Sequence, residues 1–199
     1  SSRLVKIVPE IIGSVMYRSR FHVPAPSIIA DSVTSGYAET TALTSVEVDP
    51  ANPNFESVDG VLYSKDHSRL ILYPAAKNTG GTYTVLDGVA TIAPKAFQKA
   101  GITSVTLPDS LRAIGDEAFR LSALTEVTLP DTVTSIGERA FASSTVESVT
   151  IPASVRSIGL EVFIYSSLKK ITFVDDEAHP AQLTTIADRA FANTSLESI

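Results

Sequence analysis

The chain has 199 residues, of which 44% are hydrophobic and 19% are charged, and this composition excludes a wholly disordered protein. Its length suits one domain, and its net charge of −6 argues against nucleic-acid binding. It contains no cysteine, which excludes disulfides, thiol catalysis and Cys-ligated metal sites. No apolar run reaches the about 18 residues that a membrane-spanning helix needs, so no membrane insertion is expected.

Residues 1–40 are predicted to form a degenerate N-terminal repeat or a cap. The segment Ile29–Ser35 resembles Leu129–Ser135, which belongs to the regular repeats further along the chain. Terminal units of repeat proteins are often atypical, because one of their faces has no neighbour.

Residues 41–82 are predicted to form a repeat that carries a β-meander insert. Short apolar runs at residues 55–58, 61–63 and 70–73 are separated by Asp59-Gly60 and by a polar turn, which is typical of antiparallel hairpins. Tyr63, Tyr73 and His67 lie in this insert. Two interpretations stay open: the tyrosines pack the hairpin onto the rest of the fold, or they form an aromatic binding site.

Residues 83–199 are predicted to be regular repeats, because apolar residues recur at the same intervals in several columns. The intervals are 22, 22, 22 and 28 residues. The columns are Phe97, Phe119, Phe141, Phe163 and Phe191; Ile92, Ile114, Ile136, Ile158 and Ile186; Val89, Leu111, Val133, Val155 and Leu183; and Val105, Val127, Val149, Ile171 and Ile199.

Each unit predicts one short strand followed by a turn. Residues 124–129 alternate as a strand does, and Pro130 ends the strand because proline has no N–H to donate. Val133 and Ile136 are three residues apart and precede a glycine, which indicates a 3₁₀ or helical turn. One unit alone cannot cover its apolar side. Residues 1–199 are therefore predicted to form a single solenoid, with parallel strands about 4.8 Å apart.

A column of alternating charge lies three residues after the isoleucine column. Stacking would place opposite charges beside each other, so the column indicates either ion pairs between repeats or merely solvated surface charges. Its members are Lys95, Glu117, Arg139, Glu161 and Arg189.

The repeat resembles the BspA-type leucine-rich repeat, on the pattern L-x-x-V-x-L-P-x-S-V-x-x-I-G-x-x-A-F. The segment from Asn52 to Tyr63, followed by Tyr73-Pro74, is similar to an insert of the same family. The resemblance implies a β-rich leucine-rich-repeat solenoid that lies at the cell surface or is secreted. It implies adhesion to a host matrix or cell-surface protein, without catalysis and without a cofactor.

Other functions stay open beside adhesion: a structural spacer or stalk of a longer surface protein, or a glycan-binding accessory module. The candidate contact surface is the outward side of the strands, where polar residues recur. They form either a platform for a protein or glycan partner, or simply a stable sheet surface rich in threonine. The candidate residues are Thr106, Thr128, Thr150, Thr172, Glu126 and Lys170.

No catalytic or metal site is predicted. The three histidines His22, His67 and His179 lie in unrelated segments, and the acidic run Asp175–Glu177 is interpreted as a solvated loop rather than a Ca²⁺ site. Residues 195–199 begin another strand, so we expect either a fragment of a longer protein or an end that a partner covers.

Overall fold

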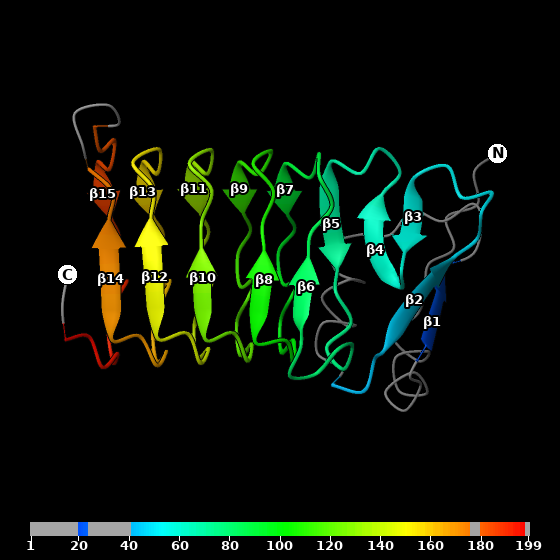
Figure 1. Ribbon diagram of the computed structural model, residues 1–199, viewed down its shortest axis with the longest axis horizontal. Helices are drawn as coiled ribbons and strands as arrows, with labels where there is room; N and C mark the ends of the chain where they lie inside the picture. The colour runs from blue at the N-terminus through cyan, green and yellow to red at the C-terminus, as the bar shows by residue number, and fades with distance from the viewer. Residues whose placement is uncertain (1–19, 24–40, 176–179, 198–199) are drawn as a thin grey trace.

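The chain winds into a row of stacked coils, each coil corresponding to one sequence repeat (Figure 1). The computed structural model describes residues 20–23, 41–175 and 180–197. Most of the predicted N-terminal cap, residues 1–40, therefore lies outside the described residues. Within it, β1 (Arg20–Val23) pairs in parallel with β2 (Ser45–Val48).

One side of the stack carries a row of short parallel strands, one from each coil. β6 pairs with β8, and β12 lies between β10 and β14 in a three-stranded sheet. We call the outward side of these five strands the strand face. The strands are β6 (Thr82–Thr84), β8 (Ser104–Thr106), β10 (Glu126–Thr128), β12 (Ser148–Ile151) and β14 (Lys170–Phe173).

A second, eight-stranded sheet runs behind the first row and is continuous along the coils. This sheet consists of a parallel set of two-residue strands and an antiparallel meander of three strands. The last strand of the meander, β5, pairs in parallel with β7, the first strand of the parallel set. The parallel set is β7 (Thr91–Ile92), β9 (Ala113–Ile114), β11 (Ser135–Ile136), β13 (Ser157–Ile158) and β15 (Thr185–Ile186). The meander is β3 (Phe55–Val58), β4 (Val61–Ser64) and β5 (Arg69–Leu72).

The 3₁₀ or helical turn expected after each strand is not confirmed, since the described residues contain no helix of either kind. Ile136 instead belongs to β11, and residues 138–143 form consecutive turns. Their N–H groups alternate: Phe141 and Ser143 donate to carbonyls of the next coil, while Ala142 donates back to Arg139. In a helix, successive N–H groups beyond the first turn all bond back within the segment.

The core is a column of stacked aromatic rings. Neighbouring rings lie 4.9–5.6 Å apart between centroids, with interplanar angles of 4–21°. The predicted phenylalanines therefore do line up, and the column begins one ring earlier than expected, at Tyr73 of the meander. Its members are Tyr73, Phe97, Phe119, Phe141, Phe163 and Phe191.

Glycine follows Ile114, Ile136 and Ile158 of the isoleucine column, where neighbouring coils approach closely. A Cβ on Gly137 would lie 2.7 Å from the backbone nitrogen of Asp116, and one on Gly115 would lie 2.6 Å from that of Pro94. Such distances are far below ordinary van der Waals contact, so a side chain would force the coils apart.

The predicted column of alternating charge forms ion pairs in part of the stack. Glu161, nearly buried, accepts from Arg139 Nε at 2.7 Å and from Arg189 Nη1 at 2.8 Å. The hydrogen bond and charge of Glu161 raise the pKa of Arg139 above its ordinary value. Glu117 instead contacts Gln98 and Arg120, so the alternation does not extend to the first coils.

Candidate functional site

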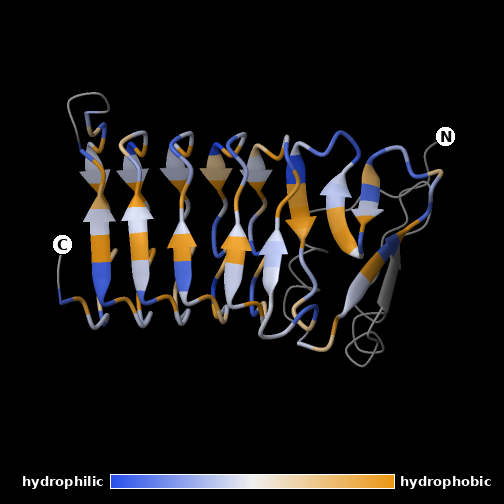
Figure 2. Cartoon of the chain, in the orientation of Figure 1, coloured by the Kyte–Doolittle hydropathy of each residue, from blue (hydrophilic) through white to orange (hydrophobic). Residues whose placement is uncertain are grey.

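The strand face is polar because the strands alternate between inward and outward residues. The middle residues Val105, Val127 and Val149 are buried, while their neighbours on each strand reach solvent. Figure 2 shows this as an apolar, orange part on β8, β10, β12 and β14, with β10 and β14 beginning in hydrophilic blue.

The candidate residues all lie on this face, in two rows across the strands. In one row Thr128, Thr150 and Thr172 lie opposite one another in register, and in the other Glu126 and Lys170 flank Ser148. Thr150 is half-buried, and the other candidate residues are exposed.

The threonine row is interrupted, which the sequence did not predict. Thr106 lies in register with Thr84 of β6, and no ladder pairs β8 with β10. An open pocket of about 420 Å³ lies at this interruption and includes Thr106, Glu126 and Thr128 among its lining residues. Asp109 and Pro130 also line this pocket. The sequence did not predict them as site residues, because the 22-residue repeat interval gives no sign of an interruption there.

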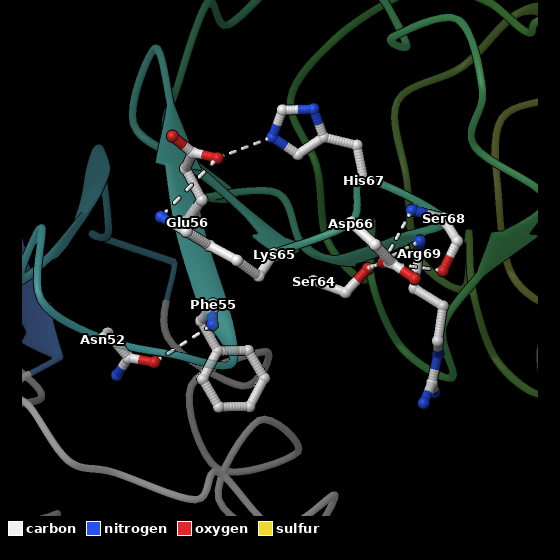
Figure 3. Close-up of polar contacts among 9 residues, drawn as sticks. All are labelled: Asn52, Phe55, Glu56, Ser64, Lys65, Asp66, His67, Ser68 and Arg69. Atoms are coloured by element: carbon white, nitrogen blue, oxygen red, sulfur yellow. Dashed lines mark hydrogen bonds and ion pairs between the residues drawn. The ribbon is translucent and has the colours of Figure 1, made fainter.

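The meander carries a polar cluster at its turn, shown in Figure 3. His67 Nε2 lies 2.8 Å from Glu56 Oε2, and Lys65 Nζ lies 3.9 Å from the same oxygen. Asp66 Oδ1 accepts hydrogen bonds from both the Oγ and the N–H of Ser68, at 2.8 and 3.0 Å, and from Ser64 Oγ at 2.6 Å. These bonds lower the pKa of Asp66 to about 2. Asp66 therefore holds together the turn between β4 and β5, because its partners Ser64 and Ser68 lie on either side of it.

The meander tyrosines are part of the core, so they do not form the aromatic binding site considered above. Tyr63 and Tyr73 are almost completely buried, and the hydroxyls of Tyr63 and Tyr83 are hydrogen-bonded at 2.5 Å. Burial raises the pKa of all three tyrosines. Of the two interpretations, packing of the meander onto the solenoid is therefore the correct one.

Within the described residues, no group of three or more His, Cys, Asp or Glu side chains is arranged to hold a metal ion. His179 and most of the run Asp175–Glu177 lie outside the described residues. The part of the chain that the structure describes contains no helix that is long and apolar enough to cross a membrane.

Parallel coils, inward-facing apolar columns and a row of one strand per coil define a leucine-rich-repeat solenoid. Residues 90–199 match the family described as the BspA type leucine rich repeat region, with six copies. The chain belongs to this family. No functionally curated protein matches it.

Several solved structures share the fold. A leucine-rich repeat protein from Eubacterium ventriosum is 21% identical and has a TM-score of 0.59, with 91% of this chain and 60% of that chain covered. The pneumococcal vaccine antigen PcpA is 22% identical, with a TM-score of 0.58 and coverage of 91% and 55%.

A leucine rich cell surface protein from Faecalibacterium prausnitzii is 25% identical, with a TM-score of 0.59 and coverage of 81% and 49%. The chain thus spans between about half and three-fifths of the length of these three structures.

Proposed function

We propose that the chain is a non-catalytic binding module of a cell-surface or secreted protein, and that it contacts a protein or glycan partner through the strand face. The observation that carries the proposal is the regular array of exposed polar side chains on β8, β10, β12 and β14, held by a buried core. Solenoid proteins commonly bind partners along such extended surfaces.

Cell-surface or extracellular localisation is supported by what the chain is similar to. One similar structure is a cell surface protein, and another is a vaccine antigen of pneumococcus. Adhesion to a host matrix or cell-surface protein is the activity that the BspA-type repeat suggests, and it is part of this proposal.

A non-catalytic role agrees with the geometry of the strand face. Catalysis usually requires a cleft in which titratable groups converge with perturbed pKa values. On the strand face, Glu126 and Lys170 stand two strands apart, and Ser148 lies between them.

A spacer or stalk is the second candidate function, and the aromatic column favours it. Six stacked rings and a sheet that is continuous through the same coils would resist bending. A spacer needs this stiffness and no ligand.

Binding to immobilised extracellular-matrix proteins and to a glycan array distinguishes these functions. We expect Thr128→Lys with Thr150→Lys to weaken binding at least tenfold, or about 1.4 kcal/mol, because two ammonium groups would occupy the contact surface. The control is Thr134→Lys with Thr184→Lys, which adds the same charge at exposed positions outside the strand face. Unchanged binding by the first variant would exclude the strand face, and no binding by the parent chain would favour the spacer.

A further inference from the structure

The strand face opens between β8 and β10, although the sheet behind it stays closed. β9 pairs with β11 in the same two coils, so the coils are stacked as closely there as elsewhere. On the strand face, Thr125 N–H donates to Thr103 O at 3.1 Å just before the strands. No ladder joins β8 to β10, and beyond the two strands Thr132 Oγ1 donates to Leu111 O at 2.6 Å.

The pocket at this opening combines an apolar floor with a polar rim. Val105 and Leu107 are only 7% and 8% exposed, and with Pro130 they supply apolar surface. The hydroxyls come from Ser104, Thr106 and Thr128, and the carboxylates come from Asp109 and Glu126.

The charge of the lining is entirely negative. Glu126 is exposed, and neither its carboxylate nor that of Asp109 has an ion-pair or hydrogen-bond partner among the described residues. The nearby Arg112 donates to the carbonyl oxygens of Asp109 and Leu111 rather than to a carboxylate. At the position of Glu126 the neighbouring strands have Ser104 and Ser148, so this charge is particular to the opening.

We propose that this pocket binds a basic side chain, arginine or lysine, that projects from a protein partner. This proposal rests on the proposed function of the strand face and specifies the chemistry of the partner. The aliphatic stem of such a side chain would pack on Val105, Leu107 and Pro130, as long basic side chains do on apolar surface. Its charged end would reach Glu126 and Asp109, and carboxylates bind guanidinium groups especially well.

A protein partner fits this pocket better than a glycan does. The lining contains no aromatic ring on which the apolar face of a sugar could pack. The two carboxylates attract a cation, and a neutral sugar offers no charge to complement them.

The proposal is tested by NMR titration of the ¹⁵N-labelled chain with acetyl-Gly-Arg-Gly-amide. The control ligand has citrulline in place of arginine, which keeps the shape and removes the charge. We expect the arginine peptide to shift the amide signals of β8 and β10 in a saturable manner, and the citrulline peptide to leave them unchanged.

Variants then identify the residues. Glu126→Gln with Asp109→Asn should weaken arginine-peptide binding at least fivefold. Asp131→Asn should not, because Asp131 is the equivalent of Asp109 one coil further on and lies outside the pocket. All three positions are exposed, so the variants should fold as the parent does, which thermal melts check.

Each alternative outcome has a defined meaning. Equal shifts with arginine and citrulline, unaltered affinity of the double variant, or saturation of the same amides by a neutral oligosaccharide alone would overturn the proposal. If the parent chain binds a matrix protein and the double variant binds it equally well, the pocket proposal fails while the strand-face function stands. If the pocket binds the arginine peptide but the chain binds no protein or glycan surface, the proposed function fails instead.

Discussion

Each of the five coils that carry a core phenylalanine holds two non-glycine residues in the left-handed region of backbone space. In the middle coil these are Arg139 and Ser143, with φ of 52° and 54°. The conformation costs roughly 1–2 kcal/mol for an L-residue. Both residues donate their N–H groups to carbonyls of the next coil, at Leu160 and Ile164. Stacking therefore stabilises a backbone that one isolated coil would not adopt.

Glu161 links its coil to both neighbouring coils by ion pairs, with Arg139 on one side and Arg189 on the other. Replacing it with glutamine keeps the shape but removes the charge that Arg139 and Arg189 share, and leaves Arg139 paired with Glu138 alone. We expect Glu161→Gln to lower the free energy of unfolding by about 1–2 kcal/mol, since both arginines are partly exposed and screened by solvent.

Urea unfolding at low and high salt measures this effect. The matched control is Glu138→Gln, because within the described residues the carboxylate of Glu138 pairs with one arginine, Arg139, and its side chain is 44% exposed. The control should cost less than about 0.5 kcal/mol. Equal losses in the two variants would contradict the role assigned to Glu161.

The meander is the element that departs most from the repeat, yet it is joined to the stack at two levels. β5 pairs with β7, and Tyr73 stacks on Phe97 with centroids 5.0 Å apart. Tyr63 adds a hydroxyl contact to Tyr83. The meander therefore packs directly against the first regular coil, through both its backbone and its side chains.

The turn of the meander should respond to acid through Asp66. Its pKa is lower in the folded chain, about 2, than the ordinary value of 3.8. A carboxylate with a depressed pKa stabilises the fold above its unfolded pKa, and this contribution is lost as the pH falls toward the folded value. We expect the difference in unfolding free energy between the parent and Asp66→Asn to be largest above pH 4 and to shrink toward pH 2.

Urea unfolding from pH 5 to pH 2 measures that difference. Asp131→Asn provides the comparison, because its carboxylate has no hydrogen-bond partner among the described residues, and its effect should stay constant. A constant difference for Asp66→Asn as well would show that the turn contributes no pH-dependent stability.

The whole molecule is organised by its aromatic column, which crosses every coil from the meander onward. Phe141 is completely buried and stacks on a ring at each side, at 5.1 and 5.4 Å. We expect Phe141→Ala to cost roughly 3–5 kcal/mol, because the surrounding side chains relax only partly into the cavity that a fully buried ring leaves.

Denaturant unfolding monitored by circular dichroism tests this cost. Phe191→Ala serves as the comparison, since Phe191 is only half-buried and stacks within the described chain on Phe163 alone. Its loss should be clearly smaller. A cost below about 1 kcal/mol for Phe141→Ala would mean that the column does not hold the coils together.

The sequence predicted the coils and their inward columns because those depend on side chains that recur at a fixed interval. The helical turn predicted near Ile136 is wrong, since a strand forms there. That two-residue strand depends on hydrogen bonds to β9 and β13 of the neighbouring coils, and so short a strand shows no alternating pattern in the sequence. The sequence also missed Tyr73 as the first ring of the column, since Tyr73 lies 24 residues before Phe97 rather than 22.

The sequence could predict which side of the strands carries the candidate site, but not where on that side a pocket lies. Alternation along β10 and β12 places Thr128 and Thr150 outward, and both lie there. The opening beside β8 could not be predicted, because Thr106 and Thr128 are separated by the same 22 residues as Thr128 and Thr150. Pairing between coils depends on backbone position, which repeat spacing does not reveal.

Equal coil length has an evolutionary consequence. Duplicating or deleting one unit would change the reach of the solenoid by about one strand spacing, 4.8 Å, and would keep the apolar columns in register. A lineage can thus adjust how far such a protein extends in small increments, provided that charges joined between coils, such as Glu161 with Arg139 and Arg189, are adjusted with it.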